Sequence, residues 1–450
     1  MRRLFASLAC LSFAFTAVAE TLDLEQAIER ALTSDPRIEE REHLVNAAQG
    51  LLQQVKGHGD WFVESNAFIG LTNQVDGNIY EGGTCTAAKC ELRDDKYEFN
   101  GLSPWFYVRM ALVKPLYSFG KLENYAEAAR ANIDIKGGDV RLQRGATVLD
   151  VKRAYYGYLA ARDGRLLLED VDKRLQGAIN LVEGWLEEGE GDVKQADLYA
   201  LQSGQALVGK YRAQSAALEK IALDGLKVVT GVGLDQELEV ADRRLRPLPE
   251  PEFSLAELKQ QALQQRPEME QLEAGLKARR SLVAANKSEN KPNIYAGLGG
   301  VLSYSPGRDR LDNPYISDPF NEGALTPVLG VQWSWSEGVQ SGKTAAAQAE
   351  LDALIAKSSF ARQGIPYQVA EQYYQVQGHY EAVQKLEQAG RSARRWMIAS
   401  YTDFEAGLEK AEKIMTAMQA YALAMTDYVQ TTFEYNMHVA RLENVAGMNE

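Results

Sequence analysis

Apolar and polar side chains alternate with a two-residue period in four stretches of the chain. This period is typical of β-strands that have one apolar and one polar face. In the second stretch, Phe106, Val108 and Met110 fall on one face, whereas Tyr107 and Arg109 fall on the other. The four predicted strands cover residues 61–72, 105–117, 293–304 and 326–335.

Two segments without proline have the composition of long helices. No proline occurs between Pro115 and Pro247 or after Pro366, and Ala, Glu, Gln, Lys and Leu dominate both segments. Each segment predicts a helical hairpin, with arms at residues 122–188 and 192–230, and at 340–403 and 408–446. Helices of this length are stable only when they pack along their length, as in coiled coils. Pro366 should kink or interrupt the arm that contains it.

The same order of elements occurs twice. A helix opens each half, at residues 22–57 and 254–289, with Asp23 and Ser254 as expected N-caps. Single residues recur at fixed distances: Leu24, Ala31, Leu32 and Pro36 return 231 positions later, and Gly120, Tyr155 and Tyr156 return 218 positions later. We infer an internal duplication with repeats at residues 20–246 and 247–450. At the offset of 218, the apolar faces of the second and fourth strands fall on opposite parity, which indicates a β-bulge or a wrong register.

The N-terminus has the features of a secretory signal peptide at residues 1–19. Arg2 and Arg3 precede a short apolar run, and Ala17-Val18-Ala19 forms a small-residue cleavage site. Beyond it no run of about 18 apolar residues could form a transmembrane helix. The net charge of −13, from 49 basic and 62 acidic residues, argues against binding to nucleic acid. The predicted destination is the bacterial periplasm or outer membrane.

Cys85 and Cys90 remain after removal of the signal peptide. They lie in the segment 73–104, which is rich in Gly, Asp and Asn and predicts a surface loop. In an oxidising compartment this pair predicts a small disulfide loop. A metal site is the alternative, but two thiolates without a nearby His are an incomplete ligand set.

Four strands per chain are too few to close a membrane barrel, because the smallest barrels use about eight. Three chains would supply twelve strands, and their long hairpins could stand side by side as a helical tube. The predicted fold class is therefore an α+β membrane protein. Its trimer has a twelve-stranded barrel that continues into a long helical barrel. A soluble periplasmic coiled-coil adaptor or structural protein is the alternative, but it leaves the aromatic-flanked strands unexplained.

The chain resembles the TolC family of outer-membrane efflux and secretion channels. The resemblance rests on residues 24–36, on Lys114 through Gly120, and on the two hairpin turns at 191–197 and 401–407. It implies a homotrimer in outer-membrane lipid with a periplasmic helical extension. It also implies two partners, a periplasmic adaptor and an inner-membrane transporter. The expected function is that of an exit duct in a tripartite efflux or type I secretion system.

The resemblance also implies a gate at the inner tips of the hairpins, near Gly191 and Gly407. Asp197 matches the acidic lock position of the first hairpin. In the second hairpin, Phe404 stands where the family has a Tyr lock partner, and Glu409 stands where it has a basic one. Two further departures fall at the acidic pore ring, which is replaced here by Lys413 and Thr416. The alternative for Asp197 is a solvated residue on the helix surface.

No sequence pattern indicates catalysis. The four histidines, His43, His58, His379 and His438, are scattered, and neither a nucleophile triad nor a Walker loop occurs. We therefore expect no enzyme, no cofactor and no metal site. Drug efflux, protein secretion and metal export are not distinguished by these residues.

Overall fold

The computed structural model describes residues 20–75, 80, 85–92, 101–189, 193–310, 315 and 317–448. The predicted signal peptide lies outside these residues. The described chain divides into two compact units, each drawing on both halves of the sequence. The helical unit contains residues 1–43, 136–271 and 358–450, and the sheet unit contains residues 44–135 and 272–357.

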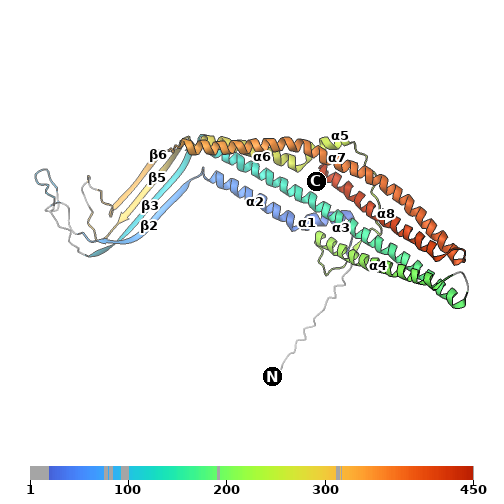
Figure 1. Ribbon diagram of the computed structural model, residues 1–450. Coiled ribbons are helices and arrows are strands. Elements are labelled where there is room, and N and C mark those ends of the chain that lie inside the picture. The colour runs from blue at the N-terminus through green and yellow to red at the C-terminus, as the bar shows by residue number, and fades with distance from the viewer. Residues whose placement is uncertain are drawn as a thin grey trace, which may run out of the picture. The chain divides into compact units, whose positions relative to one another are not determined.

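The sheet unit contains one antiparallel sheet of four strands (Figure 1). The strands are β2 (Phe62–Asn73), β3 (Leu102–Tyr117), β5 (Asn293–Tyr304) and β6 (Glu322–Gln332), in the order β2-β3-β5-β6. All four lie within a few residues of their predicted positions. Among the described residues, the outer edges of β2 and β6 pair with no further strand.

One face of this sheet is apolar across all four strands. The pairing register places Phe106 of β3 beside Ile69 of β2 and Tyr304 of β5, and it places Leu329 of β6 beside Ala296 of β5. We call this surface the apolar face; its largest residues are Val63, Ile69, Leu71, Phe106, Met110, Leu112, Leu298, Leu302, Leu325, Leu329 and Val331. Many of these side chains are exposed, with Ile69 and Leu329 each 76% exposed.

The opposite face carries polar, small and aromatic residues, and we call it the polar face. Glu64, Asn66, Arg109 and Gln332 lie on it. An aromatic group on the same face stacks Phe68 against Tyr107 and Trp105, with ring centroids 4.8 Å apart in both pairs. The sheet is therefore two-sided, with only one side suited to an apolar environment.

A β-bulge explains the opposite parity predicted for the second and fourth strands. The β3–β5 register shifts between Pro115 and Tyr117, which leaves one extra residue in β3. Before this point the apolar positions of β3 correspond to those of β6 at an offset of 219, and after it Gly120 corresponds to Gly338 at 218. The two apolar patterns therefore share one face of the sheet.

Each predicted opening helix is two helices, so the prediction of single helices at 22–57 and 254–289 is wrong. The first divides into α1 (Leu24–Ser34) and α2 (Pro36–Gly57), and the second into α5 (Leu255–Gln265) and α6 (Pro267–Ser288). The residues between them, Asp35 and Arg266, are extended. A residue that precedes proline disfavours the helical region, which explains both breaks. The predicted N-caps Asp23 and Ser254 both form capping boxes.

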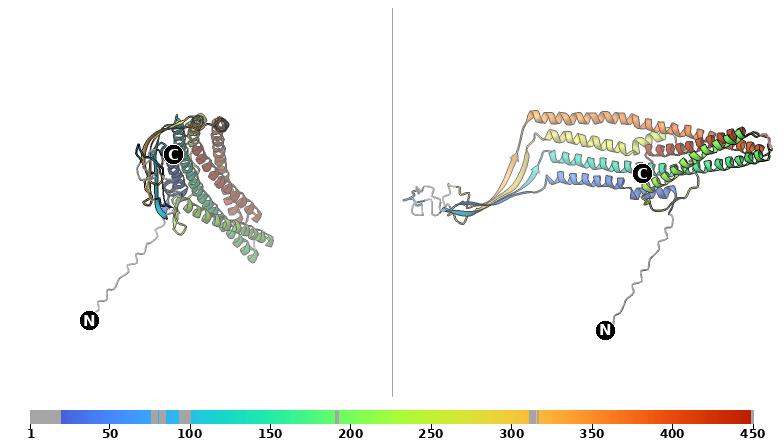
Figure 2. Two further views of the ribbon diagram at one scale, coloured as in Figure 1. Left: turned by 90° about the vertical axis from the view of Figure 1, so that its left-hand side faces the viewer. Right: turned by 60° about the horizontal axis from the view of Figure 1, so that its bottom comes forward.

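The long arms form two hairpins, α3 (Lys121–Glu188) with α4 (Gln195–Thr230) and α7 (Glu337–Glu405) with α8 (Ala411–Val445). The predicted interruption at Pro366 does not occur, because α7 continues through it. In the sheet unit, α2 and α6 and the starts of α3 and α7 lie side by side in the order of the strands they adjoin (Figure 2). No helix among the described residues has the length and apolar character needed to cross a membrane.

The helical unit has an extensive apolar core. Three clusters of buried residues line its helices, and Tyr155 and Tyr435 are fully buried there. A two-stranded parallel sheet, β1 (Glu20–Leu22) with β4 (Leu238–Val240), contributes Leu22 and Leu238 to this core. The sequence gave no sign of this sheet, because strands of three residues have no detectable period.

Candidate functional site

The inner ends of the two hairpins pack around one apolar cluster in the helical unit. Residues of α3, α4, α7 and α8 all contribute to it. Phe404 of α7 is fully buried there, and its ring meets Trp185 of α3 edge to face with centroids 5.1 Å apart. The aromatic residue at the predicted lock position therefore packs inside its own chain and joins the two hairpin tips.

Gly407 ends α7 in the left-handed conformation that glycine adopts without strain. Its φ is +70°, and a Cβ at this position would meet no atom within 4 Å. The N–H of Gly407 donates to the carbonyl oxygen of Phe404, and the N–H of Leu408 donates to that of Asp403, both at 2.8 Å. These two bonds form a Schellman motif. The turn therefore requires glycine for its backbone, not for close packing.

Asp197 lies in the first turn of α4 and is partly buried. Its carboxylate accepts a hydrogen bond from the backbone N–H of Lys194 at 2.9 Å, and its own N–H donates to the carbonyl of Lys194 at 2.8 Å. A carboxylate here also offsets the positive end of the helix dipole. Asp197 thus has a defined role at the start of α4, in addition to any contact with another chain.

Glu409 lies in the turn before α8 and forms an ion pair with Lys413, whose side chain is 66% exposed. Thr416 donates its hydroxyl hydrogen bond to the carbonyl of Glu412 at 2.9 Å. The predicted lock position is therefore neutralised locally by a cation from the position that is acidic in some relatives. Gly191, the other predicted turn residue, lies outside the described residues; within them, Gly189 follows α3 with φ +70°.

A shallow groove of about 640 Å³ lies between α4 and α8 near the same tips. Ala200, Ser203 and Gly204 of α4 form its floor, with Lys210 at one end and Met415 of α8 at the side. Because the floor has only small side chains, the α4 backbone is accessible there. The groove can accept an elongated apolar side chain or a second helix.

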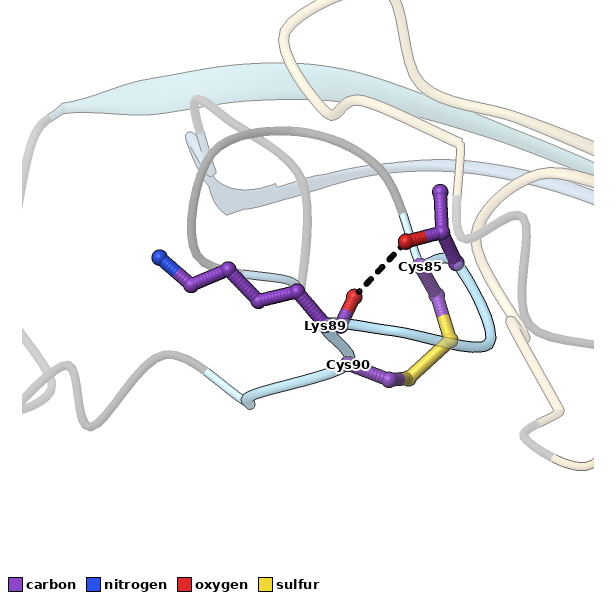
Figure 3. Close-up of a disulfide and its surroundings, with 4 residues drawn as sticks. Cys85, Lys89 and Cys90 are labelled. Atoms are coloured by element: carbon purple, nitrogen blue, oxygen red, sulfur yellow. Dashed lines mark hydrogen bonds between the residues drawn. A yellow bond between two sulfur atoms is a disulfide. The ribbon is translucent and has the colours of Figure 1, made fainter.

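Cys85 and Cys90 form a disulfide with a Cα–Cα distance of 4.4 Å (Figure 3). Between them, Thr86 and Lys89 exchange backbone hydrogen bonds of 3.0 and 3.1 Å. The bridge therefore closes a tight turn in the segment that joins β2 to β3. The incomplete thiolate site considered as an alternative would need these same two sulfur atoms.

Sequence reasoning did not foresee a histidine pair between α7 and α8. The rings of His379 and His438 lie with centroids 4.6 Å apart, and His379 approaches Glu434 at 3.5 Å. Burial lowers the pKa of His438, as do His379 and Arg441, against the opposing effect of Glu434. The two histidines are 59 residues apart, so only the hairpin brings them together. Within the described ranges, no group of three or more potential ligands could hold a metal ion.

Comparison with known proteins adds to these observations. Residues 258–448 match the family described as Outer membrane efflux protein. No curated protein sequence gives a significant match. The fold is similar to that of the CmeC outer membrane channel of Campylobacter jejuni, with a TM-score of 0.77, 11% identity and coverage of 100% of this chain and 94% of that one.

Two further channel structures are similar over most of their length. VceC of Vibrio cholerae gives a TM-score of 0.73 at 13% identity, covering 94% of this chain and 96% of that one. The open state of MtrE from Neisseria gonorrhoeae gives 0.73 at 15% identity, covering 94% and 89%. These findings confirm the resemblance to TolC-like channels that the sequence indicated.

Proposed function

Because residues 258–448 match the outer membrane efflux protein family and the fold is that of outer-membrane channels, we propose that this chain is an exit duct of a tripartite efflux or type I secretion system. The duct lies in the bacterial outer membrane and extends into the periplasm. One observation above all supports the proposal: a continuous, exposed apolar face over four strands in a chain that otherwise consists mainly of long helices.

The finer part of the proposal is a homotrimer with a twelve-stranded barrel. The free edges of β2 and β6 support it, since an antiparallel β6–β2 pairing between copies would complete the hydrogen bonding of both strands. A backbone edge left unpaired in hydrocarbon is prohibitively unfavourable. In the closed barrel the apolar face contacts outer-membrane lipid and the polar face lines the conduit.

An unpartnered seam on α4 also supports the trimer. Leu207, Tyr211, Leu218, Ile221 and Val228 recur at heptad spacing, and they are between 46% and 66% exposed. They lie on the side of α4 opposite its buried residues, such as Leu201 and Leu226. We call these five residues the α4 seam. A second copy of the chain would bury it as coiled-coil helices bury one another.

The proposed partners are a periplasmic adaptor and an inner-membrane transporter. The groove between α4 and α8 supports an adaptor contact, because its floor of small residues lets a helical hairpin approach the α4 backbone closely. Its place near the hairpin tips also matches the end at which the expected gate lies. We propose Gly191, Asp197, Phe404, Gly407 and Glu409 as residues of that gate, with Phe404 acting through its packing.

Two further proposals concern the architecture of the chain. The first is an internal duplication with repeats at residues 20–246 and 247–450, preceded by the signal peptide 1–19. It is supported by the matching order of elements, two helices, two strands and a hairpin in each half. The second is that the Cys85–Cys90 disulfide lies outside the cell, since it is in the segment between β2 and β3.

Membrane fractionation combined with cross-linking tests the proposed function. We expect the protein in the outer-membrane fraction after carbonate washing, with cross-linked species that end at three copies. Recovery in the soluble fraction would support the coiled-coil adaptor instead. A monomer that keeps its full strand content in mild detergent would contradict the shared barrel.

A further inference from the structure

The loop between β5 and β6 folds back over the polar face of the sheet. The described part of this loop, residues 305–310 and 317–321, contacts side chains that the register places on that face. Ser103, Trp105 and Ser303 are the main ones. All lie at the end of the sheet that bears the inter-strand loops. The apolar face makes none of the contacts described below.

A chain of hydrogen bonds attaches the loop to the sheet. The indole N–H of Trp105 donates to Ser303 Oγ at 2.8 Å, and this hydroxyl donates to the carbonyl of Pro319 at 2.6 Å. On the other arm of the loop, the N–H of Gly307 donates to Ser103 Oγ at 2.7 Å. Ser103 and Ser303 are 1% and 3% exposed, so the loop covers them almost completely. Buried hydroxyls that are fully bonded hold a loop in one position.

Arg308 joins the two arms of the loop. Its guanidinium lies 4.2 Å from the centre of the Phe320 ring, and its Nη1 donates to the carbonyl of Asn73 at 3.0 Å. Phe320 in turn packs against Trp105, with ring centroids 5.0 Å apart. Arg308 forms no ion pair with a described residue. Its interactions thus link β2, the first arm of the loop and the second arm.

The backbone fixes the same position. Gly307 accepts a hydrogen bond from the N–H of Val75 at 3.1 Å, and Asp309 donates one to the carbonyl of Val75 at 3.1 Å. A Cβ on Gly307 would lie 2.5 Å from the Cβ of Ser103, which is closer than two carbon atoms can approach. Any larger residue at 307 would therefore push the loop off the sheet.

We propose that residues 305–310 and 317–321 form a collar that narrows the outward end of the conduit, with Arg308 as its latch. The collar is a size-selecting element for whatever the duct exports, and it is distinct from the gate at the hairpin tips. The inference rests on the proposed function, because only in a closed barrel does the polar face line a conduit. A loop bound to that face then occupies part of the cross-section.

Size-graded thiol labelling tests the collar. Asn66, on the polar face, is replaced by cysteine, and intact cells are treated with a small maleimide or with maleimide-coupled polyethylene glycols of increasing size. Arg308→Ala and Gly307→Leu are introduced to release the loop. Arg310→Ala is the matched control, since Arg310 removes the same charge nearby but makes none of the contacts above.

We expect the small maleimide to label Asn66→Cys in every variant. The largest polymer that reacts should be larger in Arg308→Ala and Gly307→Leu than in the parent, and unchanged in Arg310→Ala. An equal size limit in all four proteins would overturn the collar, as would the same increase in Arg310→Ala. If even the small reagent fails everywhere, position 66 does not face a conduit, which overturns the collar together with the barrel of the proposed function.

Discussion

Asp197 combines a local structural role with a place at the expected gate. Its carboxylate accepts the N–H of Lys194 in the first turn of α4. An asparagine could accept the same bond, whereas an alanine could not, so the two substitutions separate the hydrogen bond from the charge. Loss of such a contact at a helix start is worth about 0.3–1 kcal/mol.

We predict that Asp197→Ala loosens the tip and raises the single-channel conductance in planar bilayers, without changing the yield of trimer. Asp197→Asn should conduct like the parent protein, because the cap is preserved. Glu187→Ala, which removes an exposed acid nearby, is the control and should have no effect. If Asp197→Asn conducts like Asp197→Ala, the charge itself holds the gate closed. No change in either variant would show that Asp197 is only a surface residue.

Asp35 lies in a network that can be tested by pH. Burial raises the pKa of its carboxyl, but hydrogen bonds from Arg37 and Thr147 outweigh this effect and leave the pKa below its ordinary value of 3.8. A carboxyl with a lowered pKa contributes stability above its unfolded pKa, and this contribution is lost as the pH falls through the folded value.

We predict that Asp35→Asn lowers the free energy of unfolding by about 1–3 kcal/mol near neutral pH. The difference from the parent should shrink as the pH falls below about 4. Urea unfolding followed by tryptophan fluorescence at a series of pH values would measure it. A difference that stays constant with pH would contradict the role assigned to the Asp35 carboxylate.

At the scale of elements, the sequence predicted what depends on local chemistry. The N-caps Asp23 and Ser254 follow from the side-chain oxygen that each can offer to an N–H of the first turn. The breaks before Pro36 and Pro267 follow from the same kind of local rule, which the prediction of single helices overlooked. The burial of Phe404 could not be predicted, because its neighbour Trp185 is 219 residues away in the sequence.

The turn at Gly407 permits a prediction in which two glycines respond with opposite sign. Gly407→Ala should lower the free energy of unfolding by about 1 kcal/mol, because alanine is strained at φ +70°. Gly378→Ala, in the interior of α7 with open space around its Cα, should raise it by about 0.5–1 kcal/mol. Chemical denaturation of both variants measures the difference. Equal effects would show that the Gly407 turn can rearrange.

At the scale of the whole molecule, the periods of the sequence established the faces but not their neighbours. The two-residue period identified the apolar residues of all four strands. Only the register, with its bulge at Pro115, shows that they form one surface. The β1–β4 sheet and the collar loop were missed for a related reason. Both depend on contacts between residues about 200 or more positions apart, such as Ser103 with Gly307.

The α4 seam gives the sharpest test of assembly. Leu218 is 58% exposed and lies in the middle of the seam, so a charge there leaves the core of the single chain intact. If a second copy buries this position, Leu218→Glu places an unpaired carboxylate in an apolar interface, which costs several kcal/mol per contact. We predict loss of the cross-linked trimer with retention of helical content measured by circular dichroism.

Ala213→Glu introduces the same carboxylate on the flank of α4 and is the matched control; it should leave the trimer intact. A trimer that persists in Leu218→Glu would show that the seam faces water or another protein, and that the strand edges alone hold the copies together. Failure of both variants to assemble would point to net charge on α4 and not to burial at position 218. The contrast between the two positions therefore isolates the contact that the seam is proposed to make.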